Sequence, residues 1–259
     1  MAIAIRTDKE IDLIRDAGRI VGRILKRLEK ESVVGVTTAH LAEISDQMIE
    51  EAGADPLFKG VKNPKASFVF PASICASINE ELVHGIPGQR KLCFGDILSI
   101  DCGVRLKGYC GDAAITVMIG QVQPEIQKLV ITTREVLDIA VTECRPGRYW
   151  SEIAGKMQSH AERTGFSVVR DYVGHGIGRK MHEDPKIPNF VSDELLQNDF
   201  MLRKGMILAV EPMVNMGTSR VKVLSDGWTV VTADHKPSAH FEHTLAITDC
   251  GAEVLTESE

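Results

Sequence analysis

The 259-residue sequence predicts a mixed α/β (α+β) protein in which a unit of two helices followed by strands occurs twice. Helical periodicity appears at about residues 8–53 and again at about 124–165, and each time it gives way to short apolar runs broken by glycine. The segment Gly95–Asp101 also resembles Gly205–Glu211. We therefore expect one domain over 1–259, with pseudosymmetric halves at about 8–120 and 124–251.

The first half begins with two amphipathic helices. Thr7 and Glu10 have the spacing of a capping box, and the apolar residues that follow recur on one helical face. These apolar residues are Ile14, Ala17, Val21, Leu25 and Leu28. After a turn at Gly35, a second helix carries Leu41 and ends at Gly53, since glycine is favoured directly after a helix.

Strands are expected over residues 68–78, 97–102 and 109–119, where the helical period is lost between glycines. The second half repeats this order. A helix starts at Pro124, a turn at Pro146-Gly147 precedes a second helix that ends at Gly165, and strands follow.

The repeat extends to single residues. Gly35, Leu41 and Gly53 recur as Gly147, Ile153 and Gly165, at a constant offset. In the matching segments a glycine opens an apolar strand, and a carboxylate, Asp101 or Glu211, closes it. Asp112 and Glu242 each open a strand as well, so two equivalent strand pairs would each deliver two carboxylates.

Composition excludes several function classes. The net charge of −6 and the lack of a basic run argue against nucleic-acid binding. No apolar stretch has the length of a membrane span or of a signal peptide, so we expect a cytoplasmic protein. The six cysteines show no C-x-x-C spacing and are expected to be free thiols, which leaves carboxylate and imidazole as metal ligands.

The four carboxylates favour a metal site, because a carboxylate beside a buried strand must be protonated, paired or bound to metal. For any one of them, exposure to water or pairing with lysine or arginine is the alternative. His175 lies between glycines in Gly174–Gly178 and could complete the set, and His182 and His84 are further candidates. Oxygen-rich ligands favour Mn, Fe or Co, and four negative charges match two divalent ions, which together generate a hydroxide nucleophile.

Five segments carry a resemblance to the methionine aminopeptidases: 99–103, 111–112, 174–178, 210–213 and 241–244. The resemblance covers nearly the whole chain. It implies a pita-bread fold, with the two halves around a central antiparallel sheet and a dinuclear centre. The implied metal ligands are Asp101, Asp112, His175, Glu211 and Glu242.

The same resemblance implies that Glu211 is also the general base and that His84 and His182 contact the substrate, which fits the acid–base properties of these side chains. It further implies that Phe70, Cys75 and Trp228 form the pocket for the methionine side chain. Plain core packing remains the alternative for these three. Two departures from the family pattern, Ser67 and Met181, leave the detailed pocket shape open.

Within this family the chain resembles a bacterial-style type I enzyme. Only 28 residues separate His182 from Glu211, which leaves no room for the type II insertion, and no Cys/His-rich extension precedes Thr7. We expect a monomer that acts on the N-terminus of peptides and nascent chains with a small second residue; contact with the ribosome is left open. The alternatives are a prolidase or proline-specific aminopeptidase, which usually carries another N-terminal domain, and a non-catalytic binding module, which predicts substituted ligands.

Overall fold

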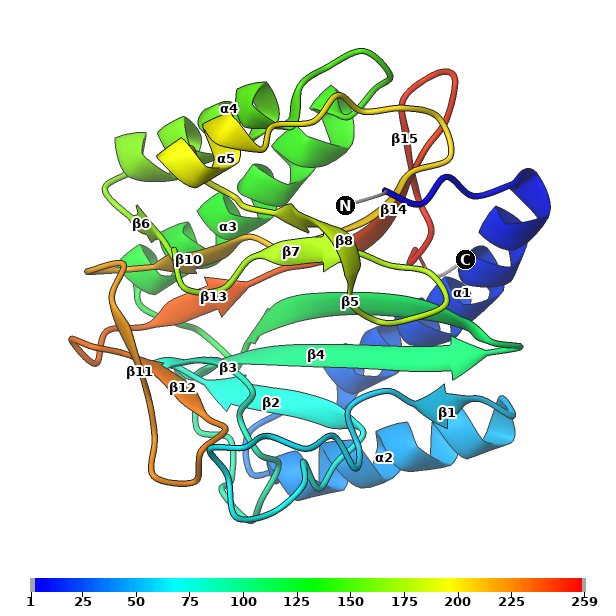
Figure 1. The fold of residues 1–259 in the computed structure, drawn as a ribbon. Helices are drawn as coiled ribbons and strands as arrows, with labels where there is room; N and C mark the ends of the chain where they lie inside the picture. The colour runs from blue at the N-terminus through cyan, green and yellow to red at the C-terminus, as the bar shows by residue number, and fades with distance from the viewer. Residues whose placement is uncertain (1–2, 258–259) are drawn as a thin grey trace.

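The computed structural model describes residues 3–257 and contains helices and antiparallel strands in the predicted order. In Figure 1, α1 (Asp8–Glu31) and α2 (Thr38–Glu51) cover the lower strands, and α3 (Pro124–Glu143) and α4 (Trp150–Arg163) cover the upper ones. The strands that carry the expected ligands lie between these two helix pairs.

The helices form where their end signals and apolar faces predict them. Thr7 caps α1 through the predicted capping box with Glu10, and the predicted apolar face of α1 is buried. Gly53 and Gly165 follow α2 and α4 with φ of 62° and 94°, a conformation that glycine adopts without strain. A further short helix, α5 (Asp193–Gln197), was not predicted.

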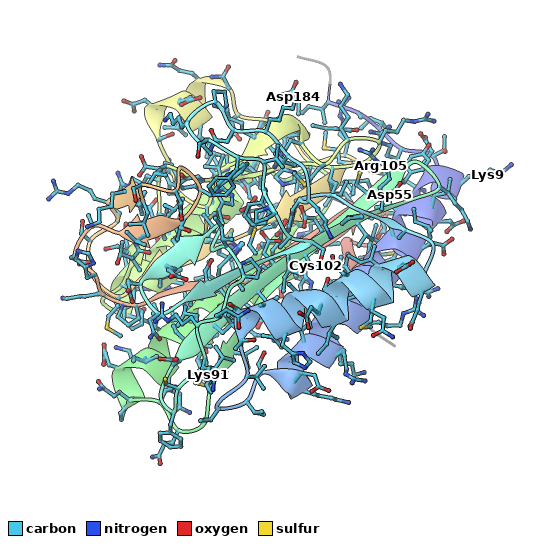
Figure 2. The ribbon with its side chains drawn as sticks, turned by 90° about the horizontal axis from the view of Figure 1, so that it is seen from below. Lys9, Asp55, Lys91, Cys102, Arg105 and Asp184 are labelled. Atoms are coloured by element: carbon cyan, nitrogen blue, oxygen red, sulfur yellow. The ribbon has the colours of Figure 1, made fainter. Side chains whose placement is uncertain are left out.

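The first half builds a sheet of β1 (Asp55–Pro56), β2 (Ile74–Ile78), β4 (Ile97–Leu106) and β5 (Tyr109–Met118), and β3 (Glu81–Val83) belongs to another sheet. Strand β4 pairs with the other three in this sheet. Figure 2 shows Asp55 and Arg105 at the same end of the sheet, as the β1–β4 register requires.

Two strand predictions need correction. The strand expected from residue 68 begins only at Ile74, because Phe68 and Val69 lie in an exposed loop with no ladder partner among the described residues. The strand expected over 97–102 continues to Leu106, since its whole length pairs with β5.

The strands of the second half are shorter than β4 and β5 and form three sheets, one of which includes β3. Their orders are β15-β14-β9-β7-β8, β13-β10-β6 and β11-β12-β3, and every pairing is antiparallel. The strands are β6 (Ser167–Val168), β7 (Gly174–Gly176), β8 (Glu183–Ile187), β9 (Ile207–Val210), β10 (Met213–Asn215), β11 (Val221–Val223), β12 (Val230–Thr232), β13 (Ser238–His240), β14 (His243–Ile247) and β15 (Ala252–Val254).

The two halves share equivalent backbone hydrogen bonds at the positions of the sequence repeat. Gly35 N–H donates to Leu92 O at 2.8 Å, and Gly147 N–H donates to Leu202 O at 2.9 Å. The strand-opening glycines behave in the same way: Gly95 donates to a carbonyl after β5 at 2.8 Å, and Gly205 donates to the last carbonyl of β14 at 2.9 Å. Superposition of 8–120 on 124–251 remains a prediction, and these matched bonds support it.

Two large apolar clusters lie under the two helix pairs. One contains Leu28 and Ile100 from the first half, and the other contains Trp150 and Leu208 from the second. All six cysteines are free, as predicted. Within residues 3–257, the helices are too short or too polar to cross a lipid bilayer.

Candidate metal centre

Two neighbouring strands of the first half carry Asp101 and Asp112. The register pairs Asp101 with Ala114 and Gly103 with Asp112. Asp112 is thus the fourth residue of β5 and does not open the strand, which corrects the prediction. The ladder fixes the backbones of both aspartates on rigid strands, which a metal site requires of its ligands.

Glu211 and Glu242 come from the second half. Glu211 follows the last residue of β9, and Glu242 directly precedes β14. Glu242 N–H donates to Ala114 O at 2.9 Å, so an isolated bridge joins Glu242 to β5. Thr244 strengthens this junction because its hydroxyl accepts from Asp112 N–H and donates to Asp112 O. The bridge brings carboxylates from the two halves together.

His175 lies in the middle of β7 between two glycines that have no room for a side chain. A Cβ on Gly174 would lie 2.3 Å from Ala209 O, and one on Gly176 would lie 2.3 Å from Asp184 O. His175 Nδ1 donates to Gly176 O at 3.0 Å, which leaves a lone pair on Nε2. This tautomer suits a metal ligand, because its free lone pair is on Nε2.

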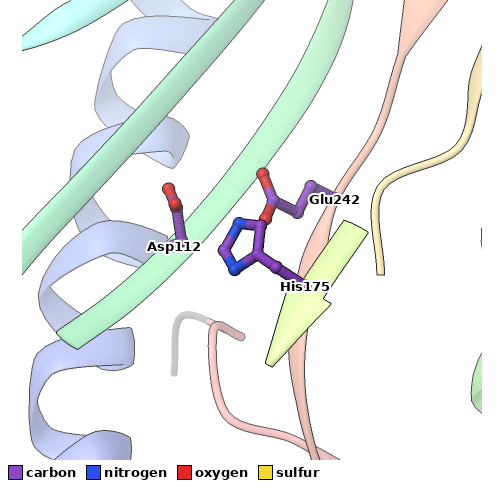
Figure 3. Close-up of side chains that lie close together, drawn as sticks. All are labelled: Asp112, His175 and Glu242. Carbon is purple, nitrogen blue, oxygen red and sulfur yellow. The ribbon is translucent and has the colours of Figure 1, made fainter. Parts of the chain in front are cut away.

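The structure brings the predicted ligands together. Asp112, His175 and Glu242 each offer an atom within 4.8 Å of the others, and Figure 3 shows their side chains converging from β5, β7 and the segment before β14. His175 Nε2 lies 3.6 Å from Glu211 Oε1. Together with burial, the negative charge of Asp101 raises the pKa values of Asp112, Glu211 and Glu242, which places its carboxylate near theirs. These five residues therefore surround one space.

The electrostatics of this space fit a cation. Asp101 Oδ1, Asp112 Oδ1 and Glu242 Oε1 are buried without a hydrogen-bond partner among residues 3–257. Burial raises the pKa of Asp101 to about 7. Burial first, and then the neighbouring carboxylates, hold the pKa values of Asp112 and Glu242 well above their usual range, and Glu211 is raised in the same way. Divalent ions would neutralise this cluster and satisfy its orphaned oxygens.

His182 lies beside His175, and His84 lies near His182. The His182 ring centroid is 4.4 Å from that of His175, and the His84 ring packs edge-on against Tyr172 at 5.6 Å. His84 has a positive φ of 59°, which is uncommon outside glycine. Burial, and then the nearby His182, lower the pKa of His84 to about 4, and burial lowers the pKa of His182. Both imidazoles are therefore neutral near pH 7.

Phe70, Cys75 and Trp228 are buried in one apolar cluster. The Phe70 and Trp228 rings meet edge-on at 5.2 Å, and Trp228 Nε1 donates to Phe68 O at 3.1 Å. Cys75 lies opposite Asp101 in the β2–β4 ladder, which links the cluster to the carboxylates. Met181 packs against the same cluster, whereas Ser67 is exposed.

Sequence reasoning missed His240, which is buried in β13 with Nε2 3.7 Å from Glu211 Oε2. A signal was available. His240 precedes Glu242 by two residues, and side chains two apart in an extended segment share a face. Glu183 was also missed as a support, although it pairs with Arg6 and accepts the N–H groups of Arg179 and Lys180 beside His182.

Residues 12–249 match the model of metallopeptidase family M24. The chain belongs to metallopeptidase family M24. Membership in a metallopeptidase family fits the convergence of carboxylate and histidine side chains at this site.

Individual relatives match nearly the whole chain. It is 47% identical over 254 residues to a methionine aminopeptidase of Clostridium perfringens, with 98% of each chain covered. It is 46% identical over 254 residues to methionine aminopeptidase 1 of Bacillus subtilis, covering 98% of this chain and 99% of the relative. The crystal structure of a Thermotoga maritima methionine aminopeptidase matches with a TM-score of 0.93 and 41% identity, over 99% of this chain and 100% of the other. The predicted resemblance and the pita-bread fold are confirmed.

More distant solved structures share the fold. An Xaa-Pro dipeptidase of Bacillus anthracis matches with a TM-score of 0.77 and 21% identity, over 98% of this chain but 62% of the other. At this identity, the similarity indicates a shared fold and says nothing about a shared activity. Between His182 and Glu211 the structure has β8, the short helix α5 and β9, with no larger helical insertion.

Proposed function

We propose that this protein removes the N-terminal methionine from peptides and nascent proteins whose second residue is small. The observation that carries the proposal is the convergence of Asp112, His175 and Glu242, with Asp101 and Glu211 beside them, in a chain 47% identical to a methionine aminopeptidase. All five predicted ligands are present, which argues against a non-catalytic module on this fold.

The five residues would hold two divalent ions, because four carboxylates carry the charge that two such ions neutralise. Oxygen-rich donors favour Co, Mn or Fe. When bound, such ions supply Lewis acidity that polarises the peptide carbonyl and acidifies water. Membership in M24 supports metal dependence, and the number and identity of the ions are part of the proposal.

Glu211 is assigned the role of general base in addition to that of ligand. Its carboxylate lies between two imidazoles, at 3.6 Å from His175 and 3.7 Å from His240, and it would accept a proton from the attacking water. His84 and His182 would contact the scissile amide and the substrate carbonyl. As neutral imidazoles they can donate an N–H to the carbonyl oxygen without adding charge near the metals.

The methionine side chain would enter the cluster of Phe70, Cys75 and Trp228. Aromatic edges attract a thioether sulfur, and the T-shaped Phe70–Trp228 pair presents such an edge. Because both rings are buried, they would form an apolar wall around the methionine side chain. The substrate is therefore a free N-terminal methionine, whose amine lies near the carboxylates.

The test is hydrolysis of Met-Ala-Ser by protein stripped of metal and reconstituted separately with Co, Mn or Fe. We expect release of methionine only with metal, much slower cleavage of Met-Lys-Ser, and none of N-acetylated Met-Ala-Ser. An X-Pro dipeptide tests the prolidase alternative, and its preferential cleavage would overturn the proposal. Equal rates on Met-Ala-Ser and Met-Lys-Ser would remove the second-residue specificity.

Several further assignments belong to the same proposal. We propose that residues 1–259 act as one catalytic unit and as a monomer in the cytoplasm, where nascent chains carry N-terminal methionine. The ribosome is a candidate partner through those chains. The acidic balance of the chain, −6, argues against a nucleic-acid surface.

A further inference from the structure

His240 lies beside Glu211 with its own hydrogen-bonding capacity unused. The residue is 2% exposed, and its buried Nε2 has no hydrogen-bond partner among residues 3–257. The carboxylate oxygen Oε2 of Glu211 lies 3.7 Å from this nitrogen. That separation is longer than a hydrogen bond, so forming one requires a small movement of the side chains. Because a buried polar atom without a partner is unfavourable, Glu211 is the group positioned to satisfy it.

The backbone of His240 is fixed from two sides. Its N–H donates to Thr116 Oγ1 at 2.9 Å, and the same hydroxyl donates to His240 O at 2.8 Å. On the other side His240 pairs with Met213 in β10, the strand that follows Glu211 after Pro212. His240 and Glu211 are therefore attached to paired segments, and their relative position is set by the sheet.

The two imidazoles that flank Glu211 are not equivalent. His175 faces Oε1, and its Nδ1–H is donated to Gly176 O, so its Nε2 carries a lone pair for a cation. His240 faces the other oxygen, Oε2, and lies outside the cluster of Asp112, His175 and Glu242. A neutral imidazole beside a carboxylate oxygen directs an N–H toward it, because the opposite tautomer would place two lone pairs face to face.

We propose that His240 is a positioning residue that donates its Nε2–H to Glu211 and holds this carboxylate in the orientation needed for catalysis. The inference rests on the proposed role of Glu211 as base. It predicts that the imidazole acts through a hydrogen bond, so that an amide N–H of similar reach can replace it. Loss of such a supporting partner typically lowers activity about 10- to 100-fold.

The kinetic test compares His240→Leu with His240→Gln, which can still donate an N–H. For Co(II)-loaded protein on Met-Ala-Ser, we expect kcat of His240→Leu to fall about 10- to 100-fold, with little change in KM. His240→Gln should recover most of this loss, and both variants should bind Co(II) with the affinity and visible absorption spectrum of the parent. His160→Leu, which removes a surface histidine paired with Glu135, is the matched control with unchanged rate.

A measurement independent of activity separates this inference from the proposed function. Long-range ¹H–¹⁵N spectra of Zn(II)-loaded protein report the tautomer of each imidazole, and His240→Gln identifies the His240 signal by its loss. We expect the Nε2–H tautomer. The Nδ1–H tautomer, equal losses in the Leu and Gln variants, or a loss of metal affinity in both would overturn the inference. Failure of the parent protein to cleave Met-Ala-Ser would instead contradict the proposed function, and the tautomer would still decide the role of His240.

Discussion

The two halves of the molecule both begin with two helices followed by strands, but they differ in the strands around Asp101 and Glu211. In the first half β4 is continuous over Ile97–Leu106, and Asp101 lies within its ladder. In the second half the corresponding stretch is divided into β9 and β10, with Glu211 and Pro212 between them. Proline has no N–H to contribute to a ladder, so the sheet is interrupted where the carboxylate lies.

The register extends this difference to the neighbouring strand. His175 pairs with Ala209, two residues before Glu211, and Ser77 pairs with Ser99, two residues before Asp101. Ser77 is thus the counterpart of His175, and its hydroxyl accepts the N–H of Gly85. The first half supplies two aspartates on continuous strands, and the second half supplies two glutamates together with the imidazole of His175. We infer that the two proposed metal positions are unequal, with one richer in nitrogen.

The largest expected effect is that of Glu211→Gln. The amide keeps the size of the side chain but cannot accept the proton of water, so we expect kcat to fall about 10²- to 10⁴-fold with the fold retained. Methionine release from Met-Ala-Ser, alongside circular dichroism and metal analysis, measures this. Near-normal turnover in a folded, metal-loaded variant would contradict the assignment of the base.

The asymmetry between His175 and Ser77 predicts the next effect. His175→Ala should lose metal, whereas His182→Ala should keep metal and lose rate, by about 10- to 100-fold, because His182 is assigned to the substrate. Ser77→Ala is the matched variant in the first half and should retain metal. Metal content of the three purified proteins is the measurement. Comparable metal loss in the His175 and His182 variants would mean that the ligand and substrate roles are wrongly divided.

The carboxylates also predict a pH effect in metal-stripped protein. Burial raises the pKa of Asp101 to about 7 in the folded state, from about 3.9 when unfolded. Its protonated form therefore contributes stability that is complete below about pH 4 and is lost as the pH rises through about 7. Asp101→Asn removes this dependence. We expect its free energy of unfolding, relative to the parent, to increase by up to a few kcal/mol between pH 4 and pH 7.

Comparing Asp101→Asn with the parent is essential, because buried histidines with lowered pKa values, such as His175, change stability in the opposite direction over this range. Chemical denaturation at several pH values provides the difference. If the difference in free energy of unfolding between Asp101→Asn and the parent does not change with pH, the raised pKa of the buried Asp101 carboxyl is contradicted. With saturating metal, Asp101→Asn should be less stable than the parent near pH 7, which reverses the sign of the stability difference. The reason is that the parent alone gains the full stabilisation by bound ions.

The smallest expected effect distinguishes the first helices of the two halves. Helix α1 has a capping box at Thr7, whereas Gln123 before α3 makes no side-chain capping bond. Thr7→Ala should destabilise the protein by about 1 kcal/mol, and Gln123→Asp should stabilise it by about 0.5–1 kcal/mol. Urea midpoints measure both. The two effects need not be equal in size. Destabilisation by Gln123→Asp would show that the free N–H groups at the start of α3 already have partners.

Local signals in the sequence were enough to predict α1 to α4 and the sequence repeat, because Thr7 with Glu10, Gly53 and Gly165 act on their own neighbours. The loop at Phe68 and Val69 could not be predicted in this way. Its residues have strand-like side chains, but the loop is held by Trp228, whose indole N–H donates to Phe68 O across 160 positions of the chain. Such a contact has no local signature.

The candidate site could also be predicted in part from the sequence. The carboxylates lie within or next to strands that recur in both halves, so the repeat indicates that they belong to one site. The ladder bridge between Ala114 and Glu242, and the approach of His240 to Glu211, depend on how the halves dock. The spacing of His240 and Glu242 is compatible with one shared face, but this spacing alone does not show which carboxylate His240 meets.

The most direct test of the central claim is anomalous diffraction from crystals reconstituted with Co or Mn. We predict two peaks about 3.5–4 Å apart. Asp112, His175 and Glu242, which come from both halves, should contact one of the two peaks. Asp101 and Glu211 should supply the remaining contacts to the two ions. A single peak at full occupancy, or peaks that these five side chains do not contact, would contradict the account of a dinuclear centre built jointly by the two halves.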